Sequence, residues 1–406
     1  MSAPRLAVLS VVHAGGGGTI LTNQDLMGEL GRTGPAYVLA CGAQKWTLYD
    51  ASADFAVVET IRFVRPWSAV KPLSDDRIGV FAHVLALVSP NVVHLRSLLG
   101  SGPELALASK ALGITTVVSF HDFLAVCPTI QLLDAEQRYC GGQCTMSTID
   151  CSAPQKWFSD IPRLKNAYVH QWRARWGDAL KVADAFVTTS ESAAEILTRN
   201  LPLLDSRLKV IEHGRDTEGA ASVARAPDHA PIRVVALGAV GVAKGQDLIQ
   251  GLVKLCRKHG DPFEFHVLGV EEGAWGGAEG LVFHGAYERG GLNASLAEIQ
   301  PSFALLAPIW PETYSHTLTE AWMAGLPVLA SDIGALGERV RRHGGGWLAP
   351  PNDPSAWREV LLAASRDPVA WRQRADEIAA MQSRSIADMA RDYVALYRDA
   401  LRRRPF

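Results

Sequence analysis

The chain has 406 residues, more than the ~250–300 residues of a usual single hydrophobic core, so two domains are expected. Its 48% hydrophobic and 20% charged residues are typical of a folded globular protein. Forty Lys and Arg residues against 42 Asp and Glu residues give a formal charge of −2, which excludes the strong basic field of a general nucleic-acid binder.

The apolar stretches of the chain are short. Leu6–Val12 and Ile114–Phe120 are well below the ~18–20 residues that span a bilayer, so no transmembrane helix is predicted. A secretory signal peptide is not favoured either, because Gly15–Gly18 follows the first stretch where a cleavage site would be expected. We therefore expect a cytoplasmic protein.

Short β-branched runs alternate with longer amphipathic segments, which indicates an α/β fold with parallel sheets covered by helices. In the first half the predicted strands are Leu6–Val12, Tyr37–Ala40, Val92–Leu95, Thr115–Phe120 and Ala185–Thr188, with a helix at Asn23–Leu30. In the second half they are Arg233–Leu237, Phe263–Leu268, Leu281–His284, Ala304–Ala307 and Pro327–Ala330, with helices at Gln246–Lys258 and Thr319–Ala324.

These two series predict two Rossmann-like domains that face a cleft. We place the first domain at residues 1–212 and the second at 233–385, joined by an aperiodic linker at 213–232 that is rich in Gly, Ala, Asp and Pro. A terminal helix is expected at residues 386–406, with Tyr393 and Tyr397 on its apolar side.

A glycine run, Gly15–Gly18, follows the first strand and precedes a predicted helix. Glycines let a backbone approach a ligand closely, and the start of a helix offers unpaired N–H groups to an anion. The run is not a regular G-x-G-x-x-G fingerprint, so a tight turn without a ligand is the alternative. Later in this half, His121 and Asp122 end a predicted strand at the edge where open α/β sheets bind ligands.

The most specific segment is PIWPETYSHTLTEAWMAGLPVLASDIGALGE, in which Glu312 and Glu320 are separated by seven residues. Glu312 precedes a turn and Glu320 lies in the helix that follows, so the two carboxylates are suited to hydroxyl groups of a sugar and a ribose. Between them, the backbone N–H groups at the helix start would point at a phosphate. Those N–H groups belong to Ser315, His316, Thr317 and Leu318.

Together with the LGAVGVAKG turn at Leu237–Gly245, the glycine run and His121, this segment resembles the retaining GT-B glycosyltransferases of family 4. The resemblance implies transfer of a hexosyl or deoxyhexosyl group from a nucleotide-diphosphate sugar, without a catalytic metal, and a terminal helix that crosses back to the first domain. It further implies a role for each matching residue. Glu312 would contact the donor sugar, Glu320 the ribose, Lys244 the diphosphate and Tyr287 the nucleobase, while Gly15, Gly16, Gly17 and Gly18 would close over the donor and His121 would sit at the reacting centre.

Two positions depart from the family pattern. Ala239 stands where the family usually has an Arg five residues before the diphosphate Lys, so one cationic contact is missing. Ser315 replaces a common Gly, a variation found in O-antigen and related polysaccharide transferases, and it preserves the backbone site if its φ stays negative. The residues agree with a metal-free design, because no D-x-D pair occurs for a divalent ion.

Two further clusters leave alternatives open. Cys127, Cys140, Cys144 and Cys151 could hold a structural zinc ion or remain reduced thiols, or have a disulfide or redox role. Trp157, Trp172 and Trp176 are interleaved with basic residues and could either contact an anionic membrane peripherally at its inner face or pack in the core.

The principal hypothesis is a retaining glycosyltransferase that uses a nucleotide sugar and a glycan or lipid-linked acceptor, without nucleic acid. Because of Ala239, the alternative is a catalytically impaired GT-B module that binds nucleotide or glycan in a polysaccharide assembly system. A GT-B sugar-nucleotide epimerase is a third reading.

Overall fold

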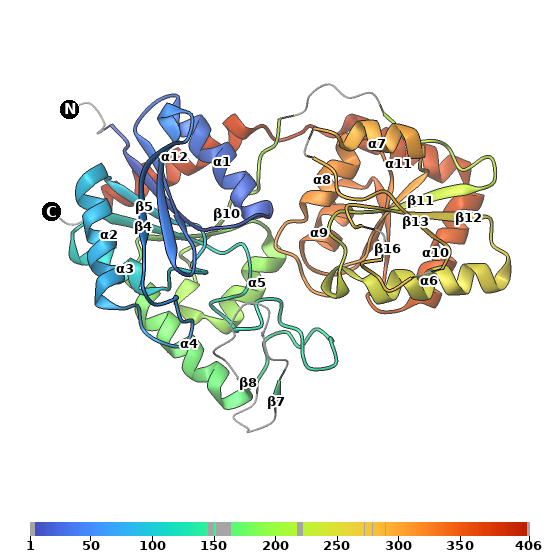
Figure 1. Ribbon diagram of the computed structural model, residues 1–406. Coiled ribbons are helices and arrows are strands. Elements are labelled where there is room, and N and C mark those ends of the chain that lie inside the picture. The colour runs from blue at the N-terminus through green and yellow to red at the C-terminus, as the bar shows by residue number, and fades with distance from the viewer. Residues whose placement is uncertain are drawn as a thin grey trace. The chain divides into compact units, whose positions relative to one another are not determined.

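The computed structural model describes residues 5–144, 150–151, 164–216, 222–271, 273–277, 279–288 and 290–403 (Figure 1). The chain divides into two compact units. The first comprises residues 1–136, 140–216 and 384–406, and the second comprises residues 217–383 together with 137–139. The chain thus leaves the first unit, forms the second, and returns to the first with its last helix.

The first unit is built on a mixed sheet whose parallel part orders its strands as a doubly wound fold does. In spatial order the strands are β10 (Leu208–Val210), β9 (Ala185–Thr188), β6 (Thr115–Ser119), β5 (Val92–Leu95), β1 (Val8–His13), β2 (Ala36–Cys41), β3 (Lys45–Asp50) and β4 (Ala56–Arg62). The strands β3 and β4 are antiparallel additions beyond β2. A separate short antiparallel pair joins β7 (Asp150–Cys151) and β8 (Leu164–Lys165).

Helices cover this sheet. They are α1 (Gly18–Gly31), α2 (Asp75–Val88), α3 (Glu104–Ala111), α4 (Asn166–Leu180), α5 (Glu191–Asn200) and the terminal helix α12 (Ile386–Arg402). Figure 1 shows α12 beside α1, at the opposite end of the sequence. Met389, Tyr393 and Tyr397 of α12 are completely buried in one cluster with Val8 and Leu26, so the helix belongs to the core of the first unit, as predicted.

The second unit has a fully parallel sheet in the spatial order β13 (Leu281–Phe283), β12 (Phe263–Leu268), β11 (Ile232–Leu237), β14 (Phe303–Leu306), β15 (Val328–Ser331) and β16 (Gly346–Ala349). In chain order within the unit this is 3-2-1-4-5-6, the order of the Rossmann fold. Its helices are α6 (Gln246–His259), α7 (Leu292–Ile299), α8 (His316–Met323), α9 (Gly334–His343), α10 (Pro354–Arg366) and α11 (Pro368–Ala380).

Alternation along β11 explains why this sheet is buried on both faces. Val234 and Ala236 belong to a cluster shared with α6 and α10, whereas Val235 and Leu237 belong to a cluster shared with α7 and α8. Because side chains of a strand alternate between faces, a run of apolar residues supplies both clusters at once. The predicted α/β class and its two Rossmann-like halves are confirmed.

Most predicted elements lie within one or two residues of the observed ones. Helix α1 begins at Gly18 rather than Asn23, and helix α8 begins at His316 rather than Thr319. The strands β3, β4, β10 and β16 were not predicted.

Candidate active site

In the second unit, the predicted site residues lie near the topological switch point between β11 and β14. From this point the chain adds β12 and β13 on one side of the sheet, and β15 and β16 on the other. At such a switch point the loops after two neighbouring strands separate, and a ligand binds outside their carboxyl ends. The loop after β11 carries Lys244, and the loop after β14 carries Glu312 and leads into α8.

Lys244 and Glu312 approach each other at this edge. Nζ of Lys244 lies 3.6 Å from Oε1 of Glu312, whose residue is only 9% exposed. Lys244 ends a short 3₁₀ helix, η3 (Val242–Lys244), and Gly245 follows with φ of 85°. A Cβ at Gly245 would collide with the backbone carbonyl of Ala307, so glycine is required for the two loops to meet.

The first turn of α8 lies beside this pair in the chain. Ser315 is its N-cap with φ of 70°, and the Ser315 side chain makes no capping hydrogen bond to the helix. The condition stated above for an intact backbone site, a negative φ at Ser315, is therefore not met. The serine adopts the left-handed conformation that a glycine would adopt without steric cost, and its hydroxyl lies 3.3 Å from that of Thr317.

Arg339 on α9 supports that turn through hydrogen bonds, and it was not identified from the sequence. Its guanidinium donates to the carbonyl oxygens of Tyr314 at 3.1 Å and Ser315 at 2.9 Å, and to the hydroxyl of Thr319 at 2.9 Å. It also lies 4.1 Å from the Tyr314 ring centroid, and the residue is 6% exposed. A buried arginine therefore fixes a backbone conformation that serine does not favour.

Glu320 and Tyr287 form a second polar pair in this unit. The Tyr287 hydroxyl donates to Oε2 of Glu320 at 3.0 Å, and both residues are half-buried. The bond links the loop after β13 to the second turn of α8. Ala239 lies on the loop after β11 and is exposed, so at this position the loop presents a methyl group to solvent.

In the first unit the switch point lies between β1 and β5. The glycine run follows β1, with φ of 143° at Gly15 and 114° at Gly17, values that a residue with a side chain rarely adopts. A Cβ at Gly16 or Gly17 would meet no protein atom within 4 Å, and this part of the loop is exposed. The glycines thus leave open space next to the start of α1.

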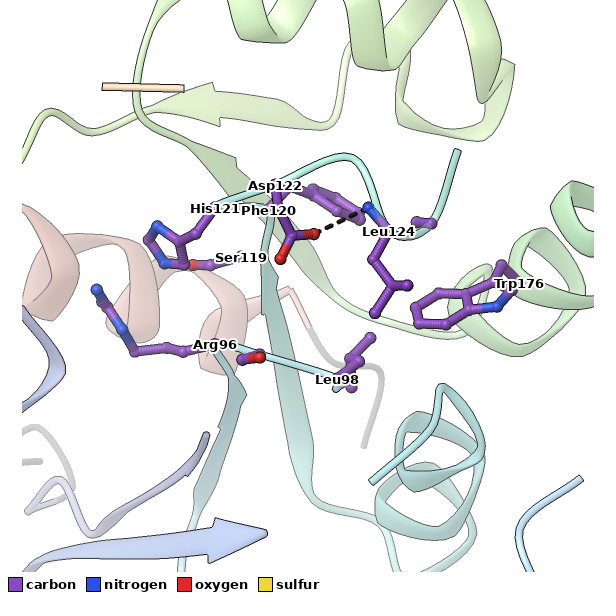
Figure 2. A pocket seen from close by; sticks show the side chains of 10 residues that line it. Arg96, Leu98, Ser119, Phe120, His121, Asp122, Leu124 and Trp176 are labelled. Atoms are coloured by element: carbon purple, nitrogen blue, oxygen red, sulfur yellow. Dashed lines mark hydrogen bonds between the residues drawn. The ribbon is translucent and has the colours of Figure 1, made fainter. Parts of the chain in front are cut away.

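His121 and Asp122 follow β6 and help to line a pocket inside the first unit (Figure 2). The His121 ring stacks on that of the buried His213 with centroids 5.2 Å apart. Oδ1 of Asp122 accepts a hydrogen bond from the Leu124 amide at 2.8 Å. Burial raises the pKa of Asp122, opposed by that amide and by the nearby His13.

Two buried residues on β5 and the turn after it, His94 and Arg96, were also missed by the sequence reasoning. His94 lies between Tyr397 of α12 and Ser119 of β6, with nitrogen–oxygen distances of 2.6 and 2.7 Å. Burial lowers its pKa well below the usual value, with further lowering by Arg96 and His121. A signal existed in the sequence, because VVHLRSLL places a histidine and an arginine in an otherwise apolar strand region.

The predicted cysteine cluster is only partly described. Cys127 and Cys140 have separate partners, because Cys127 Sγ accepts from Thr129 and Cys140 Sγ donates to the Leu132 carbonyl. The side chain of Cys151 lies outside the described residues. Within the described part of the chain, no group of three or more His, Cys, Asp or Glu side chains is arranged to hold a metal ion.

The tryptophans of the proposed membrane-facing surface are likewise only partly described. Trp172 and Trp176 are 2% and 1% exposed and stack with centroids 5.4 Å apart, so they pack in the core and cannot contact a membrane. Trp157 lies outside the described residues. Among the helices that the structure describes, none is long and apolar enough to cross a bilayer.

Comparison with known families gives two matches. Residues 16–218 match the family model described as Glycosyltransferase Family 4, and residues 231–367 match the one described as Glycosyl transferases group 1. Glycogen synthases from two strains of Mycobacterium tuberculosis are 26% identical to the chain over 266 residues, which are 64% of this chain. The chain spans 62% of the length of these curated relatives.

Solved structures resemble the chain over almost its whole length. Sucrose-phosphate synthase from Thermosynechococcus elongatus has a TM-score of 0.66 with 14% identity, covering 97% of this chain and 99% of that one. Anabaena Alr3699/HepE, solved in complex with UDP-glucose, has a TM-score of 0.63 with 14% identity, covering 96% and 99%. A glycosyltransferase from Rickettsia africae has a TM-score of 0.64 with 14% identity, covering 98% and 100%. These similarities establish a shared fold.

Proposed function

This chain belongs to glycosyltransferase family 4 and has the GT-B fold, and from that premise we propose that it is a retaining glycosyltransferase. It moves a sugar from a nucleotide-diphosphate sugar to a glycan or lipid-linked acceptor. The observation that carries the proposal is the edge of the second sheet. There, a lysine and a buried glutamate lie 3.6 Å apart, next to the start of α8, whose N-cap serine makes no capping hydrogen bond.

Positive charge at this edge suits the departure of a nucleotide diphosphate. When the bond between sugar and phosphate breaks, negative charge grows on the leaving oxygen, and groups aimed at that oxygen lower the barrier. Lys244 supplies a full charge, and the N–H groups of His316, Thr317 and Leu318 supply the positive end of the α8 dipole. Glu312, held beside Lys244, accepts hydrogen bonds from the hydroxyls of the sugar.

The remaining residues position the two ends of the donor. Glu320 binds the ribose, and Tyr287, already bonded to Glu320, lies against the base. For the first unit, we assign the open space at Gly16 and Gly17 to the donor phosphates or sugar and His121, which lines a pocket of this unit, to the reacting centre. Support for a nucleotide sugar as donor comes from the UDP-glucose complex of Anabaena Alr3699/HepE.

The test begins with a thermal-shift screen of UDP, GDP, dTDP and ADP, followed by donor hydrolysis with the matching nucleotide sugars. A ligand at ~100 times its Kd stabilises the native state by about 2.7 kcal/mol, a shift that the screen can detect. Anomeric NMR of the transferred sugar then distinguishes retention from inversion.

Lys244→Ala is expected to raise the activation barrier by about 2–4 kcal/mol, which lowers turnover roughly thirtyfold or more. Lys254 is exposed on α6, so Lys254→Ala is the matched control. A loss below tenfold would instead favour a second candidate, a nucleotide-binding module without efficient catalysis. Ala239, exposed where a second cation is expected, is the observation that favours that candidate. Isomerised donor as the product would indicate an epimerase.

A further inference from the structure

The pocket beside His121 contains a buried charge that the proposed reaction does not use. Arg96 follows β5 and is 1% exposed, yet Nε and Nη1 of its guanidinium have no hydrogen-bond partner among the residues that the structure describes. Its Nη2 donates to the Thr22 hydroxyl at 3.3 Å, a long bond to a neutral group. Buried charges in proteins are normally paired, because an unpaired one loses its hydration without compensation.

Among the residues that the structure describes, no acidic side chain forms an ion pair with Arg96. Its guanidinium carbon lies 5.3 Å from the ring centroid of Tyr393, and burial keeps the neighbouring His94 from taking a proton easily. Among the described lining residues, Asp122 is the one carboxyl group, and no ion pair joins it to Arg96. Figure 2 shows the Arg96 guanidinium on the side of the pocket where His121 lies, separated from the Asp122 carboxylate, which is turned to the Leu124 amide.

The pocket has room for a small group. Its cavity volume is about 20 Å³, which holds about one water-sized group, and the pocket is partly open to solvent. Polar groups dominate its wall, including Ser97, Ser119 and His121 beside Arg96, with Trp176 on the opposite side. A small charged group at the end of a larger molecule suits this volume and this lining.

We propose that Arg96 binds an anionic group, a carboxylate or a phosphate, on the acceptor. Nε and Nη1 are buried, lack a described partner and point in different directions around the guanidinium, so such a group would meet one of them through a charge-assisted hydrogen bond and supply the missing counter-charge. The assignment to the acceptor rests on the proposed function. In the proposed function the donor is bound by the second unit and by the glycine run after β1, and neither lines this pocket, so a molecule held here beside His121 is assigned as the one that receives the sugar.

The binding experiment uses the full chain without donor and three probes: glucose, glucose 6-phosphate and glucuronate, at matched ionic strength. Calorimetric titration of the wild type is expected to show at least one anionic probe binding about tenfold or more tightly than glucose. The phosphate and carboxylate arms identify which anion the pocket prefers. Equal affinity for all three probes, or binding of neither anion at millimolar concentration, would overturn the proposal without reference to any variant.

Variants test whether Arg96 causes the preference for an anionic probe over glucose. Arg96→Gln is expected to bring the anionic probe and glucose within about threefold of each other, whereas Arg96→Lys keeps the charge but loses the fork and retains part of the difference. Arg77 is the matched control, a guanidinium 3% exposed in the same unit that donates to the carbonyls of Ala43 and Arg65 and does not line the pocket. Arg77→Gln should preserve the preference. A folded Arg96→Gln protein that keeps the preference would show that the anion binds elsewhere.

Two results separate this inference from the proposed function. Because the probes bind without donor, a chain that binds glucose 6-phosphate through Arg96 but turns over no nucleotide sugar would retain the anion site and lose the transferase. Inorganic phosphate serves as the last probe. If it binds as tightly as glucose 6-phosphate, the pocket recognises a free anion and the acceptor assignment fails.

Discussion

Single residues at the edge of the second sheet have different chemical tasks, which substitution can separate. Glu312 is 9% exposed and lies 3.6 Å from Lys244, whereas Glu320 is half-buried and bonded to Tyr287. One carboxylate therefore faces the charge that assists departure, and the other faces a neutral phenol. The contrast predicts effects on turnover for the first and on nucleotide binding for the second.

Glu312→Gln should mainly lower kcat, because it removes a charged contact to the sugar whose charge changes in the transition state. Glu320→Gln should mainly weaken nucleotide binding, by roughly three- to thirtyfold, as one charge-assisted hydrogen bond becomes neutral. Steady-state kinetics and nucleotide titration measure the two effects. Glu359→Gln, on an exposed face of α10, is the control. Wild-type kcat and nucleotide affinity in both variants would contradict these roles.

Arg339 provides a second test at this scale. Arg339→Met removes the donors to the Tyr314 and Ser315 carbonyls and should destabilise the chain by about 2–5 kcal/mol, because each buried carbonyl left without a donor costs ~1–3 kcal/mol. Nucleotide affinity should fall with it, since the α8 turn loses its support. Urea unfolding and nucleotide titration measure both. Arg342→Met, which removes the ion pair between the exposed Arg342 and Glu338 on the same helix, is the control and should change neither. Unchanged nucleotide affinity in Arg339→Met would separate the arginine from the site.

At the scale of elements, the sequence predicts what periodicity encodes. Apolar β-branched runs located most of the parallel strands, and β12 (Phe263–Leu268) was predicted with its observed bounds. The antiparallel strand β4 was missed because its residues are largely exposed at a sheet edge, so burial does not select apolar residues there. The start of α1 was missed because Gly18 and Thr19 are poor helix formers, and tertiary packing outweighs their propensity.

In the candidate site, too, residues in local sequence patterns could be predicted and residues defined by the fold could not. Glu312, Glu320 and Lys244 could be found because their spacing is a local pattern in the chain. Arg339 and Arg96 could not, because what distinguishes them is burial and the three-dimensional neighbours of their guanidinium groups. A charge in an apolar segment is a signal in the sequence, but only the fold shows whether it is paired.

Helix α12 is connected to the central strands through a buried histidine, which predicts a pH dependence of stability. His94 has a lowered pKa in the folded state, so near pH 6 and below the unfolded chain binds a proton that the folded chain does not. Stability should therefore rise with pH up to about 6.5, the unperturbed histidine value, with a slope contribution of up to ~1.4 kcal/mol per pH unit.

His94→Gln should remove that contribution, which urea unfolding between pH 5 and 7.5 measures as a shallower slope. It should also lower stability at pH 7.5, because the bonds to Tyr397 and Ser119 are lost or altered. His259 is exposed at the end of α6, so His259→Gln is expected to leave the slope unchanged. Parallel pH profiles for wild type and His94→Gln would refute the role of His94.

At the scale of the whole molecule, the path of the chain predicts that its two units depend on the terminal helix unequally. The first unit contains α12 as part of its core, whereas the second unit closes around its own two clusters on the faces of the β11 sheet. Residues 384–386 join α12 to the first unit through backbone contacts as well. The Arg215 amide donates to the Arg384 carbonyl, and the Ile386 amide donates to the Asp216 carboxylate.

Deleting residues 386–406 should unfold or strongly destabilise the first unit, because Met389, Tyr393 and Tyr397 are each completely buried and such side chains contribute ~1.5–3 kcal/mol apiece. The second unit should remain folded and bind the nucleotide found in the screen with nearly unchanged Kd, while transfer to an acceptor is abolished. Calorimetry should show loss of one of two thermal transitions, and titration should give the Kd.

Deleting only residues 404–406, which leaves α12 complete, is the control. A truncated chain that keeps both transitions and full transfer activity would mean that α12 only covers a unit that is stable without it. Loss of nucleotide binding would instead show that the second unit depends on the first for its fold.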